Sequence, residues 1–333
     1  MRNVSLKQLR TFAAAVRSGS LSAAARQLNI TPPAVTLQMQ LLEEALGMPL
    51  AERTSAGWRP TDAGRELLLA ADRIQAALDD CERGVAQLKG LKAGRVAVSV
   101  VSTAKYFAPR LLAAFMKEFP DIELALSVGN REEIIDNLRR FQADLAIMGR
   151  PPSDIDLDTA IIGDNPHVVV AHPGHPLADA TSIPRSALSS EVFLMREEGS
   201  GTRTLADQFL LESKVSPRVG MEIGSNETIK QAVMAGLGIA LISANTVTAE
   251  AASGRIRMLR VEGTPIMRQW YVVKRLERRL MPASDRLWQF LVGEGRGLLS
   301  EMSAIVAING QAEGKDTAKA GHRNNSSGRQ ISL

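Results

Sequence analysis

The sequence predicts an α/β protein that begins with a winged helix-turn-helix, continues as a long linker helix and ends in a two-lobed α/β domain. Three observations lead to this fold class. Three short capped helical segments come first, a repeat of apolar residues at spacings of four and three follows, and strand and helix patterns then alternate. A length of 333 residues exceeds one ordinary hydrophobic core, so several domains are expected.

Composition excludes several classes of protein. Hydrophobic residues make up 45% of the chain, so cores can form. No apolar run approaches the roughly 20 residues that span a bilayer, and the N-terminus lacks the apolar segment of a signal peptide. The single cysteine, Cys81, excludes a disulfide framework within the chain. We therefore expect a soluble cytoplasmic protein with no membrane partner.

Basic residues gather near the N-terminus. From Met1 to Leu42 there are five basic residues and no acidic one, and residues 1–65 carry eight basic and four acidic side chains. A basic head on a near-neutral body is typical of a chain whose head alone contacts a polyanion. A solvated surface with a chance excess of basic residues is the alternative.

The first three helices have clear start and stop signals. Ser5 opens the first with a capping box, and Ser20 caps the second. Thr31 caps the third, which has Pro32 in its first turn and Gly47 after its end. Two helices joined by a short turn, with a capped and proline-started second member, are typical of a helix-turn-helix. An ordinary helical hairpin is the alternative.

The third helix has two faces. Its buried stripe is expected to consist of Val35, Met39, Leu42 and Leu46. Its outward positions, in the N-terminal half that enters a major groove in this motif, are Pro33, Thr36, Leu37 and Gln40. Gln40 can hydrogen-bond a base edge, Thr36 can contact a thymine methyl or a phosphate, and Thr31 lies at a helix N-terminus that favours phosphate.

Residues 49–60 predict a β-hairpin wing, because Gly57 permits a tight turn. Arg53 and Arg59 flank this turn and are candidate phosphate contacts. These residues complete the predicted DNA-binding surface.

A long helix follows from Thr61 to about Lys89. Its heptad seam consists of Leu67, Ala71, Ile74, Leu78, Cys81, Val85 and Leu88. Such a seam predicts a helix that pairs with a second copy of itself, giving a homodimer or homotetramer, and places Cys81 in the seam as a small buried hydrophobic residue.

The remaining chain alternates strands and helices. Strands are expected at 96–101, 122–128, 144–148, 168–171, 192–195, 219–223 and 239–242, with helices at 107–119, 132–141, 202–211 and 227–235. This order indicates mainly parallel, doubly wound sheets. The predicted domains are 1–60, the linker 61–92 and an effector domain at 93–309. Its first lobe is 95–162 with 268–304 and its second is 163–267. Residues 310–333 predict a disordered tail.

Ligands of open α/β sheets bind where strand ends meet helix starts. Three such points carry hydroxyl, amide and basic groups: 102–105, 129–131 and 199–203. Free backbone N–H groups at a helix start favour an anion, and Lys105, Arg131 or Arg203 can add charge. Helix capping alone also explains these Ser, Thr and Asn residues.

Segments 20–36, 42–50 and 61–64 resemble the winged helix-turn-helix of LysR-type transcriptional regulators, and the similarity is nearly continuous over residues 5–90. The two-lobed region resembles the periplasmic-binding-protein-like effector domain of the same family. Two departures concern base recognition: Leu37 stands where many members carry Arg, and Gln40 stands where a basic residue is frequent. Base recognition is therefore expected to depend on Thr36, Gln40, Pro33 and the wing.

The resemblance also implies effector contacts. Matching positions are Ser102, Thr103, Asn130 and Thr202, with Asn226 as a further candidate. Segments 101–110, 127–133 and 144–152 resemble the branch of the family that controls RuBisCO and Calvin-cycle operons. That branch implies an anionic effector such as a phosphorylated sugar, phosphoenolpyruvate or NADPH, double-stranded DNA and RNA polymerase as partners, and regulation of CO2 fixation genes. Another metabolic operon with a different small anion is the alternative.

The sequence shows no convincing motif for a dinucleotide site, a metal site or a catalytic site. The pair Gly236 and Gly238 lacks a dinucleotide fingerprint, and His167, His172 and His175 have no cysteine partner for a metal. No catalytic residues and no cofactor are expected. An enzyme with a DNA-binding head needs a nucleophile or metal cluster, and a solute-binding protein needs an export signal; neither is found.

Overall fold

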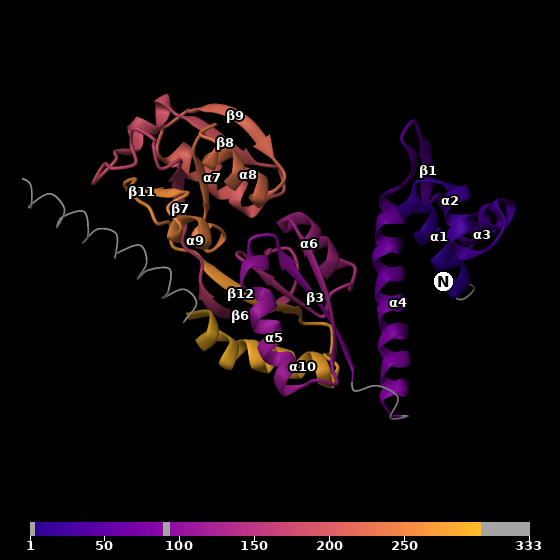
Figure 1. Ribbon diagram of the computed structural model, residues 1–333. Coiled ribbons are helices and arrows are strands. Elements are labelled where there is room, and N and C mark those ends of the chain that lie inside the picture. Colours follow the sequence, from indigo (N-terminus) through magenta and orange to yellow (C-terminus); the bar gives the residue numbers. More distant parts are fainter. Residues whose placement is uncertain (1–3, 89–93, 301–333) are drawn as a thin grey trace, which may run out of the picture. The chain divides into compact units, whose positions relative to one another are not determined.

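The structure is a computed structural model that describes residues 4–88 and 94–300. It divides into two compact units, here called the N-terminal unit (4–88 and 139–142) and the C-terminal unit (94–138 and 143–300) (Figure 1). The expected tail at 310–333, the linker residues 89–92 and the lobe residues 301–304 lie outside the described residues.

The N-terminal unit is a three-helix cluster with a hairpin and a long helix. Its elements are α1 (Leu6–Ser18), α2 (Leu21–Leu28), α3 (Pro32–Leu46), β1 (Ala51–Thr54), β2 (Gly57–Pro60) and α4 (Asp62–Leu88). The capping box is present: Ser5 Oγ accepts from the Gln8 N–H at 3.2 Å, and Gln8 Oε1 accepts from the Ser5 N–H at 2.7 Å. Phe12, Val35 and Leu42 are fully buried between the helices.

Helix α4 uses the two ends of its apolar seam differently. Leu67 and Ala71 are buried in the core of the N-terminal unit, and Asp72 forms an ion pair with Arg17 of α1. Ile74 and Val85, further along α4, are 39% and 45% exposed. The first two seam positions therefore pack within the chain, and only the later ones are exposed for a partner. Cys81 is exposed in the single chain, so its expected burial depends on that pairing.

The first lobe of the C-terminal unit is built on a five-stranded sheet of order β4-β3-β5-β12-β6. Its strands are β3 (Arg95–Val101), β4 (Glu123–Gly129), β5 (Leu145–Met148), β6 (Leu157–Asp164) and β12 (Gln269–Arg275). Its helices are the short 3-10 turn η1 (Ala104–Tyr106), α5 (Ala108–Glu118), α6 (Arg131–Arg139) and α10 (Pro282–Val292). Helix α10 packs on β3, β6 and β12 and against α5 (Figure 1). The valine-rich β3 is buried on both faces, as its near-continuous apolar run requires.

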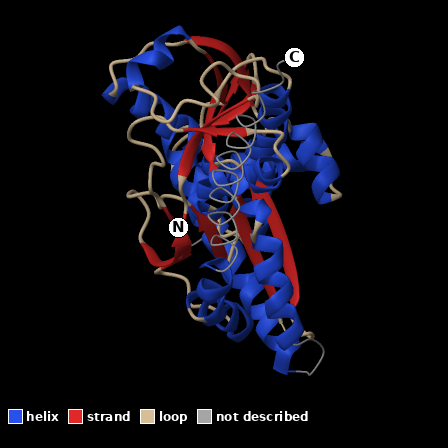
Figure 2. Cartoon of the chain, turned by 60° about the vertical axis from the view of Figure 1, so that its left-hand side comes forward, coloured by secondary structure: helices blue, strands red, loops and turns tan. Residues whose placement is uncertain are grey.

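The second lobe has two smaller sheets, of orders β10-β7-β11 and β8-β9. Its strands are β7 (His167–Ala171), β8 (Val192–Arg196), β9 (Arg218–Ile223), β10 (Ala240–Ser243) and β11 (Arg257–Leu259). Its helices are the 3-10 helix η2 (Arg185–Ser190), α7 (Gly201–Glu212), α8 (Asn226–Met234) and α9 (Ala244–Ala252). Helices α7 and α8 contact β8, and α7 and α9 contact β10, so Phe193 and Ile242 are fully buried; Figure 2 shows the chain with its helices in blue and its strands in red.

The sheets are mixed, so the prediction of mainly parallel sheets is wrong. Strand β3 is parallel to β4 and β5, and β8 is parallel to β9. Strand β12 is antiparallel to β5 and β6, and β10 and β11 are antiparallel to β7. The antiparallel strands arise because the chain leaves the first lobe after β6 and returns into it as β12. The sequence analysis did not anticipate β6, β11 or β12.

Candidate functional site

The outward side of α3 and the wing carry all the side chains that the sequence predicts to contact DNA. These exposed residues are Thr31, Pro33, Thr36, Gln40, Arg53 and Arg59. The opposite side of α3 is buried in the core through Val35, Met39 and Leu42. Helix α3 thus presents one polar face to solvent along its first half.

Local hydrogen bonds orient this face. Thr31 Oγ1 accepts from the Ala34 N–H at 3.4 Å and caps the helix, whereas Thr36 Oγ1 donates to the Pro32 carbonyl at 3.2 Å. The Thr36 hydroxyl keeps its lone pairs and its methyl group for an outside contact. Leu37 is 52% exposed beside it, so an apolar side chain stands within the polar face.

The wing is held against the end of α1. The Trp58 N–H donates to the Gly19 carbonyl at 2.9 Å. Gly57 has a φ of +111°, and a Cβ there would lie 2.6 Å from the Gly19 oxygen, so a glycine is required. Arg53 pairs with Trp58 across the hairpin and Arg59 pairs with Glu52. Both arginines therefore occupy fixed positions in the N-terminal unit.

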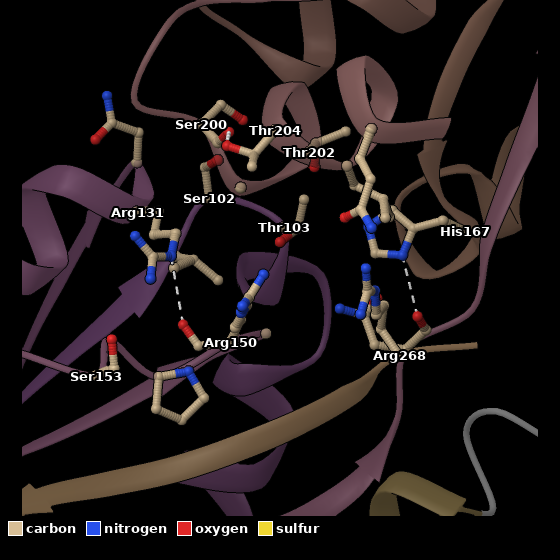
Figure 3. Close-up of a pocket in the computed structure, with 18 residues that line it drawn as sticks. Ser102, Thr103, Arg131, Arg150, Ser153, His167, Ser200, Thr202, Thr204 and Arg268 are labelled. Carbon is tan, nitrogen blue, oxygen red and sulfur yellow. Dashed lines mark hydrogen bonds between the residues drawn. The ribbon is translucent and has the colours of Figure 1, made fainter. Parts of the chain in front are cut away.

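A cavity of about 300 Å³ lies between the two lobes of the C-terminal unit (Figure 3). Four of the predicted effector contacts line it: Ser102, Thr103, Asn130 and Thr202. Ser102 and Thr103 follow the end of β3, Asn130 follows β4, and Thr202 lies in the first turn of α7. The structure therefore gathers the three predicted strand-to-helix points in one place.

The start of α7 offers backbone donors to this cavity. Ser200, the N-cap residue of α7, makes no side-chain capping bond, so the first N–H groups are left for another partner. The loop before α7 lies against α6, because the Glu132 N–H donates to the Gly199 carbonyl at 3.3 Å. Gly199 has a φ of +80°, and a Cβ there would lie 2.6 Å from Glu132 Oε2. The glycine is what permits this close approach.

The lining is strongly positive. Arg131, Arg150 and Arg268 line the cavity, and no Asp or Glu is among the described residues that do. Arg131 Nε donates to the Arg150 carbonyl at 3.3 Å, and this bond holds the Arg131 guanidinium in place at its Nε atom (Figure 3). His167 also lines the cavity, and burial lowers the pKa of its imidazole to about 4, so the ring is neutral near pH 7. Three guanidinium groups, with no carboxylate among the described lining residues, favour an anion.

Asn226 does not line the cavity, so the structure does not bring it together with the other four predicted effector contacts. It is buried behind Ser102, where its amide accepts from Arg196 Nη1 and donates to Ser102 Oγ at 3.3 Å. Arg196 is buried too, and it forms an ion pair with Glu197. Asn226 is occupied by these partners and contacts the site only through Ser102.

Two of the three expected sources of charge also lie elsewhere. Lys105 forms an ion pair with Glu227 at 3.5 Å, and Arg203 pairs with Asp207 and Glu222 at 3.0 and 2.8 Å. Neither lines the cavity. Their places are taken by Arg150 and Arg268, which the sequence analysis missed.

A signal for Arg150 was present in the sequence. It follows the buried strand β5, so the rule applied to the other strand ends also identifies it. Arg268 precedes β12 and is distant in sequence from the other lining residues. It becomes identifiable only once β12 is known to return to the first lobe.

Two other types of site are absent from the described part of the chain. No group of three or more His, Cys, Asp or Glu side chains there is placed to hold a metal ion. Within residues 4–88 and 94–300, no helix combines the length and the apolar character that a membrane span requires.

Comparison with known proteins gives the family. Residues 6–65 match the model of bacterial regulatory helix-turn-helix proteins of the lysR family, and residues 89–296 match the LysR substrate binding domain. The chain is 52% identical over 299 residues to the HTH-type transcriptional regulator CbbR of Xanthobacter flavus, covering 89% of this chain and 90% of that protein. It is 41% identical over 292 residues to the RuBisCO operon transcriptional regulator of Allochromatium vinosum, covering 88% and 97%.

A solved structure supports the same assignment. The Synechocystis PCC6803 CcmR regulatory domain in complex with 2-PG matches with a TM-score of 0.59 at 40% identity, covering 60% of this chain and 97% of that one. The expected fold class and family resemblance are therefore confirmed. The chain belongs to the LysR family of DNA-binding transcriptional regulators.

Proposed function

We propose that this regulator controls a RuBisCO or Calvin-cycle operon in response to a small anionic metabolite bound between the lobes of its C-terminal unit. The observation that carries the effector part is the lining of the cavity. Three guanidinium groups and the uncapped start of α7 meet there without a lining carboxylate. The operon is supported by the names of two relatives, CbbR and the RuBisCO operon regulator.

The size of the cavity narrows the class of effector. About 300 Å³ is at the lower end of the range for ligand pockets, which favours a phosphorylated sugar or phosphoenolpyruvate over a dinucleotide such as NADPH. The related CcmR domain was solved with 2-PG. Ser102, Thr103, Asn130 and Thr202 then add hydrogen bonds to the charge of Arg131, Arg150 and Arg268.

On DNA, the outward side of α3 is proposed to enter the major groove. Gln40 and Thr36 read base edges, Pro33 packs beside them, and Thr31 lies at the helix start near a phosphate. Arg53 and Arg59 contact phosphates from the wing. Support comes from the exposure of all six side chains on elements that the core holds rigidly.

The functional parts are proposed to be a DNA-binding head at 1–60, a linker at 61–92 and an effector domain at 93–309. The exposed seam residues of α4 pair two copies into a dimer, and dimers join as tetramers on an interrupted palindrome. RNA polymerase is the proposed partner at the promoter, since the family acts on transcription. The effector changes the relation of the lobes and thereby the spacing of the heads.

Binding experiments test this proposal. The full chain is titrated onto the promoter of the RuBisCO operon and onto an unrelated metabolic promoter of equal length. We expect selective binding to the first. Calorimetry with inorganic phosphate and a panel of Calvin-cycle phosphate esters tests the effector class. Equal binding to both promoters would contradict the operon assignment, and the absence of binding by every anion would contradict the effector class.

A further inference from the structure

His167 occupies an unusual position for a titratable side chain. It opens β7, where the chain passes from the first lobe into the second, and it is 5% exposed. Its imidazole lines the cavity beside Arg268 (Figure 3). His167 is thus a cavity residue to which the proposed anion site assigns no contact with the ligand.

The hydrogen bond of one ring nitrogen fixes the tautomer. His167 Nδ1 lies 3.1 Å from the carbonyl oxygen of Asn165. A carbonyl oxygen only accepts, so Nδ1 carries the proton and donates it. In a neutral ring the other nitrogen, Nε2, then has no proton and presents a lone pair. Figure 3 shows Nδ1 turned away from the centre of the cavity and towards this carbonyl, which leaves Nε2 on the cavity side.

The surroundings keep the ring neutral. Burial is the main cause of its low pKa, and the charge of Arg268 lowers the pKa further, while the bond to Asn165 opposes both effects. The other charged groups that line the cavity, Arg131 and Arg150, are also cationic. Among the described residues lining the cavity, no carboxylate is present to stabilise an imidazolium.

We propose that Nε2 of His167 is a hydrogen-bond acceptor that selects an anionic ligand carrying a hydroxyl group. This inference rests on the proposed anion site, and it adds a hydroxyl group to the negative charge as a second feature of the ligand. Arginine side chains only donate, and Ser or Thr hydroxyls turn to donate to an anion. The other side-chain acceptors of the lining are amide oxygens: those of Asn130 and Asn165 already accept from the Glu133 N–H and from Ser243 Oγ, and the Gln208 amide donates to Glu212. Nε2 of His167 accepts and does not donate.

An acceptor at this place discriminates between ligands. A phosphate or carboxylate oxygen placed against Nε2 meets a lone pair and gains nothing. A ligand hydroxyl donates to it, and a ligand of the same charge without that hydroxyl leaves Nε2 without a partner. We expect the ligand with the hydroxyl to bind roughly 5- to 50-fold more tightly than the ligand without it, which is the effect of one or two buried hydrogen bonds.

Calorimetry of the full chain with two matched pairs of anions tests the inference. The pairs are 3-phosphoglycerate against 3-phosphooxypropanoate, and glycerol 3-phosphate against n-propyl phosphate. In each pair the second compound lacks every hydroxyl on carbon. We expect the hydroxylated member of at least one pair to bind roughly 5- to 50-fold more tightly. Equal affinities within both pairs would overturn the inference and leave the anion site intact.

The variant His167→Phe supplies the matched comparison. It keeps a flat ring but has no acceptor, so the preference should fall to about 2-fold or less while the hydroxyl-free anion binds as before. An unchanged preference in a folded variant would overturn the role of His167. If none of the four anions nor inorganic phosphate binds the parent, the proposed function fails and this inference fails with it.

The number of protons released or taken up on ligand binding tests the same role of His167 in the parent protein, without a variant. An acceptor that stays neutral takes up no proton, so the heat of binding above pH 6 should not depend on the ionisation enthalpy of the buffer beyond the ligand's own titration. Uptake of about one proton per bound ligand would show a protonated imidazole and would overturn the acceptor role.

Discussion

Asn165 and Arg268 exchange two backbone hydrogen bonds, although they lie in the two separate chain segments that connect the lobes. The Asn165 N–H donates to the Arg268 carbonyl at 2.8 Å, and the Arg268 N–H donates to the Asn165 carbonyl at 3.3 Å. His167 and Ile266 extend the pairing with bonds of 2.9 and 2.8 Å. The connections therefore form a short antiparallel ladder that carries Arg268 and His167 to the cavity.

Removing the charge that this ladder positions should weaken anion binding. Arg268→Gln keeps a polar side chain of similar length but loses the guanidinium. We expect the affinity for inorganic phosphate or the best phosphate ester to fall by about 10- to 100-fold, the effect of a charge-assisted hydrogen bond. Calorimetry measures it. Arg255→Gln is the control, since Arg255 is exposed and does not line the cavity. Equal affinities of the two variants would remove Arg268 from the site.

His167 should make stability depend on pH. Its pKa is about 4 in the folded chain and about 6.5 when unfolded, so between these values the unfolded state binds more protons. The free energy of unfolding therefore falls as pH drops below about 6.5. From pH 7 to pH 5 the loss from this residue is about 2 kcal/mol.

Denaturant titrations at pH 7 and pH 5 measure this loss, comparing the parent with His167→Gln. The variant should lose less stability on acidification by about 2 kcal/mol. His172→Gln is the matched control, because His172 is exposed. An identical pH dependence in parent and His167→Gln would show that His167 is not buried as a neutral ring.

The two groups of DNA-facing residues should differ in their effects. Arg53→Ala and Arg59→Ala should weaken binding to operator and random DNA alike and reduce the salt slope by about one per lost phosphate contact. Gln40→Ala and Thr36→Ala should instead reduce the preference for the operator by about 1–3 kcal/mol each. Titrations at several salt concentrations separate the two effects. Equal losses on both DNAs for all four variants would contradict the assigned roles.

The exposed seam of α4 should govern self-association. Ile74→Asp and Val85→Asp place a charge at positions that are exposed in the single chain, so folding should be little affected. In a paired helix the same charge faces its symmetry mate in a drier environment, and dimers should dissociate at least 10-fold more readily. Sedimentation of the full chain measures this. Leu69→Asp is the control, because Leu69 is also exposed but lies outside the seam. Wild-type association of Ile74→Asp and Val85→Asp would show that the seam is misplaced.

Local signals made much of the fold predictable. Caps at Ser5, Ser20 and Thr31 begin α1, α2 and α3 at the residues expected. Strand ends also located Ser102, Thr103 and Asn130 at one cavity, because β3 and β4 are neighbouring parallel strands that end at the same edge. Thr202 reaches the same cavity from the second lobe, where it follows β8. These features depend on residues close in sequence, or on a general rule of parallel sheets.

Long-range topology was not predictable in the same way. The antiparallel insertion of β12 between β5 and β6 depends on the chain returning from the second lobe, and no local pattern encodes that return. Arg268 was missed for this reason. The position of Asn226 after β9 fits a ligand contact, and only the packed structure shows that its amide bonds the buried Arg196 instead of lining the cavity. Whether one polar residue is buried against another depends on the packed structure and cannot be recognised from a local sequence pattern.

Footprinting of the full chain on its operator, with and without a phosphate ester shown by calorimetry to bind, tests the central claim most directly. We expect the protected region to change over the same range of ligand concentration as the calorimetric titration. We also expect no change for Arg268→Gln at a concentration that saturates only the parent, because a ligand switches the protein only through its different affinity for two arrangements. An unchanged footprint of the parent at saturating ligand would contradict the claim that the cavity controls DNA binding.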